Sequence, residues 1–271
     1  MEYEVNEIVT DQFRMEYLCF GKGKKPFVIL PGLSVQSMIR SAPAIVGQYR
    51  RFNDDFTVYF FDRRADLPSD YDVAQMAHDT TQAFEKLELT EISLFGASQG
   101  GMISLTIAAD HPEMISRLAV CSTLMRMTQK RFHVIREWVE LARKKDREGL
   151  YLSIGEHIYP GKMYERFKDA LVGFSKTVTD EELARFIILA NGMHGFDLTG
   201  KIGQIRCPVQ VTFDEEDTVL DAEAASELAA HLSCLDGFEM RHFNGCGHAL
   251  YDTAPGFREW LYHFVTEKRE R

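Results

Sequence analysis

The sequence lacks several features that would assign it to well-defined classes of protein. No apolar run approaches the roughly 20 residues that a membrane-spanning helix needs, and the first residues are acidic, unlike a secretion signal. The five cysteines are scattered without C-x-x-C spacing, which argues against a disulfide framework and against a zinc site. The formal net charge of −10 argues against nucleic acid as a partner. These absences favour a cytoplasmic protein that acts on a small molecule and has neither a membrane nor nucleic acid as a partner.

Short apolar runs alternate with amphipathic helical segments in the first 123 residues. An opening hairpin is predicted over 3–9 and 13–20. The later strands are predicted at 27–30, 56–61, 92–95 and 118–121, and the helices at 35–49 and 73–87. This order is typical of the α/β class, with a mostly parallel sheet and helices on both faces. Neither repeats nor low-complexity segments interrupt the pattern, and the sequence leaves the oligomeric state open.

The strand pattern stops after Thr123. Between 124 and 199 we predict three helices without strands between them: one over 132–142, one over 164–174, and one opened by a capping box of Thr179 and Glu182. Strands then resume at 209–213 and 238–243, with helices at 222–232 and 257–264. We therefore predict a core domain of residues 1–123 and 200–271, with a helical cap subdomain of residues 124–199 inserted into it.

The stretch from 92 to 109 holds the clearest chemical motif. An apolar strand leads into Gly96-Ala97-Ser98-Gln99-Gly100, a G-x-S-x-G match, and an apolar helix follows. A serine on a sharp strand-to-helix turn needs neighbours without side chains, and Gly96 and Gly100 meet that need. Gly101 would allow the helix to pack closely on the strand. The order of strand, turn and helix favours a nucleophile elbow with Ser98 as the nucleophile over a chance small-residue turn.

A serine nucleophile needs a base, and the base needs an acid to orient it. His248 follows the last predicted strand in a glycine-rich loop and is the predicted general base. Asp217 follows the preceding strand and is the predicted acid, with Asp214, Glu216 and Asp221 as nearby rivals. The loop after the 118–121 strand holds no carboxylate, which strengthens this location for the acid.

A tetrahedral intermediate also needs hydrogen-bond donors for its oxyanion. One predicted donor is the backbone N–H of Gln99, directly after the nucleophile. The second is the N–H of Leu33, in the loop after the 27–30 strand, where Gly32 allows close approach of the backbone. The alternative is an ordinary turn at the end of a strand.

Taken together, these residues resemble the α/β-hydrolase superfamily, and within it the capped serine esterase and carbon–carbon hydrolase type. The resemblance covers nearly the whole chain. It implies about eight strands with only one antiparallel, a helical cap, and a Ser-His-Asp triad that needs no metal or organic cofactor. Three positions depart from the family pattern: Pro31 replaces a common histidine, Asp214 replaces a glycine, and Ala65 ends the Asp-x-Arg-Gly turn.

The resemblance and the triad predict a serine hydrolase that cleaves small or medium apolar carboxylic esters through an acyl-enzyme. Apolar cap residues favour either a substrate pocket or simple packing of the cap; they are Phe132, Trp138, Phe174, Phe186 and Met193. The same triad also suits an acyltransferase, a thioesterase or a carbon–carbon bond hydrolase. A ligand-binding or sensor protein on a hydrolase scaffold is the alternative from another class.

Two smaller features each have two interpretations. Arg63 and Arg64 follow a predicted strand, where they either meet an anionic substrate or form structural ion pairs. Cys246 lies two residues before His248, where it is either a reactive thiol or, as we favour, a buried and inert one.

Overall fold

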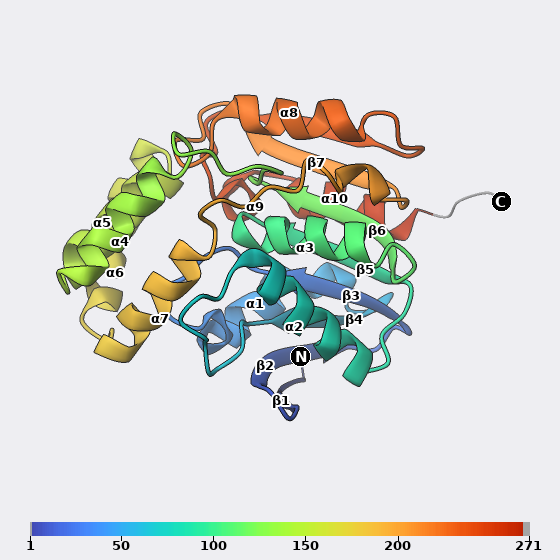
Figure 1. Cartoon of the computed structure of the whole chain (residues 1–271), viewed down its shortest axis with the longest axis horizontal. Coiled ribbons are helices and arrows are strands. Elements are labelled where there is room, and N and C mark those ends of the chain that lie inside the picture. The colour runs from blue at the N-terminus through green and yellow to red at the C-terminus, as the bar shows by residue number, and fades with distance from the viewer. Residues whose placement is uncertain (1, 268–271) are drawn as a thin grey trace.

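A computed structural model describes residues 2–267. The predicted core domain also includes residues 1 and 268–271, which lie outside the described residues. The chain forms one eight-stranded sheet in the order β1-β2-β4-β3-β5-β6-β7-β8 (Figure 1). The strands are β1 (Tyr3–Val9), β2 (Arg14–Gly21), β3 (Lys25–Leu30), β4 (Phe56–Phe61), β5 (Ile92–Ala97), β6 (Ile115–Cys121), β7 (Val209–Asp214) and β8 (Glu239–Phe243).

Strand directions confirm the predicted fold class. β2 pairs antiparallel with both β1 and β4, and every other pair is parallel, so β2 alone runs against the rest. Parallel strands end at a common edge of the sheet, and in open α/β sheets that edge holds the functional loops. The loops after β3, β4, β5, β7 and β8 therefore meet at one edge.

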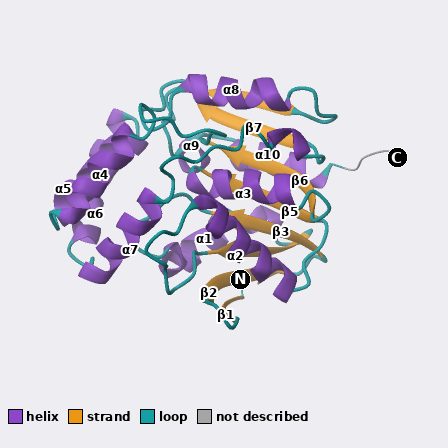
Figure 2. Ribbon diagram, in the orientation of Figure 1, coloured by secondary structure: helices purple, strands orange, loops and turns teal. Residues whose placement is uncertain are grey.

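Helices cover both faces of the sheet (Figure 2). One face packs against α2 (Val73–Lys86), α3 (Gln99–Asp110) and α8 (Ala222–Leu232), and the other against α1 (Ala42–Gln48) and α10 (Phe257–Thr266). Within β3, Val28 and Leu30 point into the first core cluster while Phe27 and Ile29 point into the second. This alternation follows from the two-residue period of a strand, and burial on both faces explains the unbroken apolar run.

The region from 35 to 49 differs from its prediction as a single helix. A 3-10 helix spans Met38–Ser41, capped by the Ser37 side chain, and α1 begins only at Ala42. Pro43 stands in the first turn of α1, where its missing N–H costs nothing. The proline therefore sets the start of α1 later than the apolar pattern indicates.

Four α-helices and a short 3-10 helix (Ile202–Gln204) lie between β6 and β7 in the chain; the α-helices are α4 (His133–Arg143), α5 (Arg147–Ile158), α6 (Gly161–Ser175) and α7 (Asp180–Asn191). In Figure 1 they lie beside the carboxyl ends of the parallel strands. The capping box of Thr179 and Glu182 at α7 is confirmed. α5 was not predicted, because only Leu150 and Gly155 are buried along it and no apolar stripe marks it. The boundaries of a cap subdomain at 124 and 199 stay a prediction.

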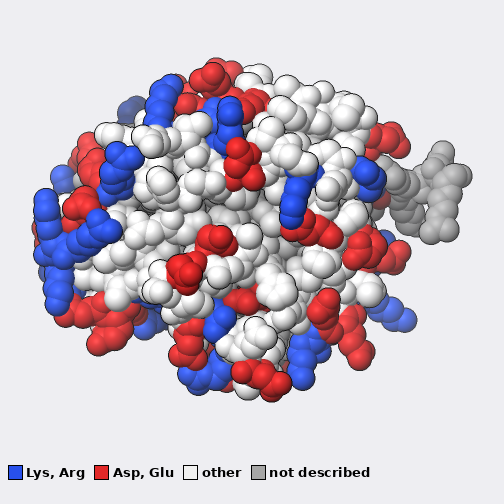
Figure 3. All heavy atoms as spheres, in the orientation of Figure 1, with Lys and Arg blue, Asp and Glu red and all other residues white. Residues whose placement is uncertain are grey.

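The surface carries both signs of charge. Figure 3 shows acidic and basic side chains interspersed over one face of the molecule. None of the helices within residues 2–267 combines the length and the apolar character that crossing a bilayer requires.

Candidate active site

Ser98 lies on the sharp turn between β5 and α3. Its backbone angles are φ 52° and ψ −120°, a strained conformation for a residue with a side chain. The turn is held on both sides: the Ser98 N–H donates to the Cys121 carbonyl at 2.9 Å, and the Thr123 hydroxyl donates to the Ser98 carbonyl at 2.8 Å. Ser98 is partly exposed although its neighbours in the turn are buried. The fold thus presents this hydroxyl to solvent from a fixed backbone.

The glycines around Ser98 are required by close contacts. A Cβ on Gly96 would lie 2.3 Å from Ser104 Oγ, and one on Gly100 would lie 2.0 Å from the Leu30 carbonyl oxygen. Gly101 packs against Thr123, just beyond β6, where a Cβ would come within 2.6 Å of the threonine Cβ. The predicted need for small residues is confirmed, although Gly101 makes room for the loop after β6 rather than for the elbow strand.

Ser98, His248 and Asp217 form one continuous chain of hydrogen bonds. His248 Nε2 lies 2.9 Å from Ser98 Oγ, and His248 Nδ1 lies 2.7 Å from Asp217 Oδ2. The other carboxylate oxygen of Asp217 accepts the N–H groups of Val219 and Leu220 at 2.8 and 3.0 Å. The structure therefore brings together the three residues predicted as nucleophile, base and acid. Their catalytic roles stay a prediction.

Two of the three rival carboxylates have other contacts, and the third, Glu216, is exposed. Asp214 is fully buried at the end of β7, and its two oxygens accept the N–H groups of Glu216 and Cys246, each at 2.8 Å. It thereby joins the loop of Asp217 to the loop of His248. Asp221 caps α8 and pairs with Arg131 at 3.2 Å. Asp214 does not adopt a positive φ, so replacing the family's glycine here introduces no backbone strain.

The helices between β6 and β7 contact both of these loops at the end of α5. The Ala249 N–H donates to the Ile158 carbonyl at 3.1 Å, and the Thr218 hydroxyl donates to the His157 carbonyl at 2.9 Å. Gly247 has φ +68°, and a Cβ there would lie 2.9 Å from the Ile158 oxygen. The glycine beside His248 is therefore required by both its backbone and this contact.

The two predicted oxyanion donors are available. Within residues 2–267, the backbone N–H groups of Leu33 and Gln99 donate to no protein acceptor. Gln99 begins α3, where the first N–H groups of a helix point outward and favour negative charge. Gly32 approaches so closely that a Cβ on it would lie 3.2 Å from Ser98 Cβ and 3.7 Å from Ser98 Oγ. The loop after β3 thus lies directly against the serine.

Sequence reasoning missed the position of Arg63. It follows β4 and is 4% exposed, and its Nη2 donates to the Pro31 carbonyl at 2.7 Å and to Gln99 Oε1 at 3.3 Å. Burial lowers the pKa of Arg63 to about 10. β4 and β3 are neighbours in the sheet, and so are β3 and β5, which is why these three loops meet. The strand order was the missing information, since the sequence alone does not place Arg63 beside Pro31.

Most of the apolar residues considered as pocket walls are packed inside. Phe132, Trp138, Phe186 and Met193 are each at most 4% exposed, whereas Phe174 lies on the surface at 57%. Some of the apolar side chains that stay partly exposed around this core belong to the loop after β3 and to α5 and α7; they are Leu33, Tyr151, Ile154, Ile158, Ile187 and Ile188.

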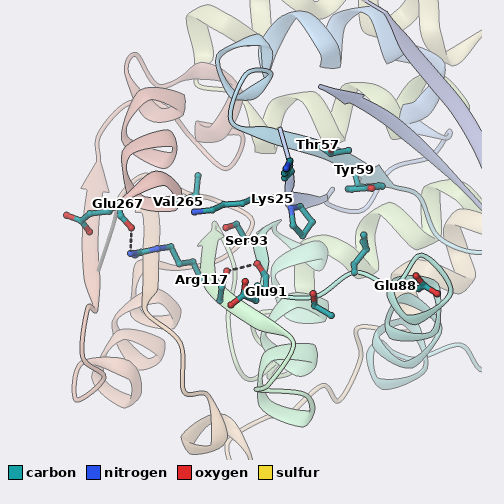
Figure 4. Close-up of a pocket in the computed structure, with 14 residues that line it drawn as sticks. Lys25, Thr57, Tyr59, Glu88, Glu91, Ser93, Arg117, Val265 and Glu267 are labelled. Atoms are coloured by element: carbon teal, nitrogen blue, oxygen red, sulfur yellow. Dashed lines mark hydrogen bonds between the residues drawn. The ribbon is translucent and has the colours of Figure 1, made fainter. Parts of the chain in front are cut away.

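A wide cavity of about 570 Å³ lies at the opposite edge of the sheet (Figure 4). Lys25, Ser93 and Arg117 line it from the amino ends of their strands, and Arg117 donates to the Glu267 carbonyl at 2.7 Å. Ser93 and Ser98 mark the two ends of β5, so this cavity is separate from the elbow. Among the residues that the structure describes, no group of three or more His, Cys, Asp or Glu side chains is arranged to hold a metal ion.

Comparisons with known proteins agree with this fold. The family model for the alpha/beta hydrolase fold matches residues 25–153. The putative carbamate hydrolase RutD of Escherichia coli O81 (strain ED1a) is 24% identical over 221 residues, covering 75% of this chain and 78% of its own. Serine hydrolase BPHL of Mus musculus is 22% identical over 241 residues, covering 83% and 75%.

Solved structures align over almost the entire chain. MGS-M2, an alpha/beta hydrolase enzyme from a Medee basin deep-sea metagenome library, has a TM-score of 0.86 at 21% identity and covers 98% of this chain and 99% of its own. The enol-lactonase from Burkholderia xenovorans LB400 has a TM-score of 0.81 at 19% identity, covering 97% and 100%. The family model, the strand order described above and these solved structures agree on the α/β-hydrolase fold, and residues 25–153 are similar to the family of that name.

Proposed function

We propose that this α/β hydrolase is a serine hydrolase that cleaves carboxylic esters through an acyl-enzyme. The observation that carries the proposal is the unbroken hydrogen-bond chain from Ser98 Oγ through His248 to Asp217. A serine hydroxyl becomes a useful nucleophile only when a base removes its proton and a third group orients that base. All three groups stand within hydrogen-bond distance here.

In the proposed reaction, His248 Nε2 takes the proton from Ser98 as Oγ attacks the carbonyl carbon. The N–H groups of Leu33 and Gln99 hold the resulting oxyanion. His248 then gives the proton to the departing alkoxide, which leaves an acyl group on Ser98. Water then attacks the acyl carbonyl while His248 takes its proton. His248 returns that proton to Ser98 Oγ as the carboxylic acid leaves. Asp217 accepts a hydrogen bond from the Nδ1–H of His248 throughout, which fixes the tautomer and stabilises the imidazolium.

We propose small or medium apolar esters as substrates, in keeping with the partly exposed apolar side chains of α5, α7 and the Leu33 loop. The names of similar proteins add carbamates and lactones to the classes to be screened. Acyl transfer, thioester cleavage and carbon–carbon hydrolysis use the same groups and differ in the acceptor or in the bond that breaks. We further propose a cytoplasmic location, which the five free cysteines support.

Labelling with a fluorophosphonate probe tests the proposal. Ser98 Oγ forms the new bond to phosphorus, fluoride leaves, and His248 takes the proton. Intact-mass analysis should show one adduct on the wild type, none on Ser98→Ala, and one on Ser116→Ala, which removes an exposed serine away from the elbow. A folded wild type without an adduct would contradict the proposal and favour a binding protein on a hydrolase scaffold.

A further inference from the structure

We propose that Arg63 is a positioning residue for the oxyanion hole, holding the loop of Leu33 and the side chain of Gln99 together from behind. This inference rests on the serine hydrolase function proposed above. Arg63 is buried at the end of β4 and contacts both elements through a single nitrogen, Nη2. Neither acceptor belongs to the groups that carry the proton from Ser98. Arg63 therefore acts on the electrostatic side of the reaction.

The first contact fixes the peptide before Gly32. In a trans peptide the C=O and the next N–H point in opposite directions, so anchoring the Pro31 oxygen sets the direction of the Gly32 N–H and the path of the chain into Leu33. Arg63 Nη2 holds that oxygen at 2.7 Å from one side. Gly100 closes in from another side, since a Cβ on it would lie 2.5 Å from the same oxygen. The Pro31 carbonyl is thus held in one orientation. This orientation also fixes the peptide that leads into the flexible Gly32.

The second contact fixes the residue after the nucleophile. The Gln99 side chain accepts from Arg63 at Oε1, at 3.3 Å, and donates from Nε2 to the Leu189 carbonyl of α7 at 2.7 Å. Gln99 is fully buried, and these two hydrogen bonds hold both the oxygen and the nitrogen of its side-chain amide. Its backbone N–H is the other predicted oxyanion donor. One guanidinium therefore joins the two loops whose separation sets the distance between the donors.

The nearby Asp62 carboxylate only partly offsets the burial of the Arg63 charge. Within residues 2–267, no carboxylate oxygen lies within 4.0 Å of its guanidinium, and its buried Nε has no hydrogen-bond partner. The nearby Asp62 instead accepts from the Arg63 backbone N–H at 2.7 Å and from Arg185 of α7 at 3.2 Å. A buried cation without a direct ion pair favours negative charge nearby, which is what the tetrahedral intermediate supplies.

The neighbouring Arg64 supplies a matched control. Its guanidinium turns away from the elbow, donating to Asp79 at 3.3 Å and to the Gln12 carbonyl at 2.6 Å. Both arginines are mostly buried and both anchor backbone, but only Arg63 contacts the oxyanion loops. Removing Arg64 should therefore cost stability without changing the chemistry.

The test compares Arg63→Met, Arg63→Lys and Arg64→Met with the wild type, using a p-nitrophenyl ester and two inhibitors. One inhibitor is an aryl trifluoromethyl ketone, to which Ser98 adds to form a bound alkoxide as the proton passes to His248. The other is the parent methyl ketone, which binds as a neutral ground-state analogue. Loss of a direct oxyanion donor typically costs 10²–10³ in kcat, so a positioning residue should cost about 10- to 100-fold.

For Arg63→Met we expect this loss in kcat, KM within about twofold, a matching rise in the Ki of the trifluoromethyl ketone, and unchanged binding of the methyl ketone. Lysine keeps the charge but lacks the planar fork, so Arg63→Lys should recover part of the loss. For Arg64→Met we expect a lower Tm, with kcat and both Ki values within about twofold of the wild type.

Other outcomes would overturn the inference. A folded Arg63→Met with kcat and trifluoromethyl ketone binding near the wild-type values would do so, as would equal weakening of both ketones, which indicates a general role in packing. If Arg63→Met does not fold, a fully active Arg63→Lys would count against the inference in the same way. A wild type without Ser98-dependent turnover would instead refute the proposed function, and the inference would fall with it.

Discussion

The proposed site has two halves that are built differently. In the proton-transfer group (Ser98, His248 and Asp217), reactive side chains contact one another directly at 2.7 and 2.9 Å. In the oxyanion group (Leu33 and Gln99), the proposed donors are backbone N–H groups. Side chains such as Arg63 contribute only by holding that backbone in place. The first group depends on which residues are present, whereas the second depends on where the backbone is held.

The largest expected effect belongs to the proton-transfer group. In Asp217→Asn the amide no longer offers His248 Nδ1–H a charged acceptor, so the histidine loses its correct tautomer. We expect kcat to fall by about 10³- to 10⁴-fold, measured on a p-nitrophenyl ester. Asp221→Asn is the control, because Asp221 caps α8 and contacts Arg131 rather than His248. Equal losses in the two variants would show that Asp217 is not the acid.

The function of the oxyanion group should be most sensitive to shifts of its backbone. Gly100→Ala would force a Cβ against the Leu30 and Pro31 carbonyls, at 2.0 and 2.5 Å. We expect the unfolding free energy to fall by about 1–3 kcal/mol from overpacking. As the loop shifts, kcat should fall by about 10- to 100-fold. Gly173→Ala in α6 meets nothing within 4 Å and should be neutral or slightly stabilising. Normal activity in Gly100→Ala would show that the loop tolerates movement.

A smaller effect is expected where the loops of the proton-transfer group are tied together. In Asp214→Asn an amide nitrogen faces either the Glu216 or the Cys246 N–H, so one buried donor loses its acceptor. We expect a loss of about 1–3 kcal/mol in unfolding free energy, read from urea denaturation. We also expect a fall of only a few-fold in kcat, since His248 and Asp217 keep their own contact. A loss of kcat as large as that of Asp217→Asn would make Asp214 part of the proton-transfer group itself.

The smallest expected effect is on the pH dependence of stability. Asp252 lines a small cavity together with Pro31 and Gly32, and desolvation there raises its pKa above 3.8 although Arg258 partly opposes the shift. The folded state then binds more protons than the unfolded state above pH 3.8, so this group makes stability fall as pH rises toward its folded pKa. Asp252→Asn should remove that fall in unfolding free energy. Denaturation curves recorded at a series of pH values from below 3.8 upward would show this. Identical dependence of stability on pH in the wild type and in Asp252→Asn would contradict this expectation.

The proton-transfer group could be predicted from sequence because its chemistry is carried by residue types at fixed places in a strand order. The motif places a serine between Gly96 and Gly100, and an acid and a histidine follow the last two strands. Predicting the group from this order needs few assumptions. The apolar runs also predicted most of the strands, since burial on both faces requires apolar residues along the whole strand. The single antiparallel strand was implied only by the family resemblance.

What the sequence did not predict depends on contacts between distant loops. Arg63 had two interpretations, and its position became clear only once β4, β3 and β5 lay side by side. Asp214 was counted as a departure, although its carboxylate replaces conformational freedom with two hydrogen bonds. α5 escaped because a helix that buries little has no apolar period to detect.

The order of the proposed groups along the chain has a consequence for biosynthesis. His248 follows Ser98 by 150 residues, and both it and Asp217 come after α4 to α7 in the chain. Domains emerge from the ribosome amino end first, so the elbow can form long before its base exists. A serine without a base is a weak nucleophile. A nascent or truncated chain therefore carries a harmless hydroxyl, and reactivity begins only when the last strand has joined the sheet.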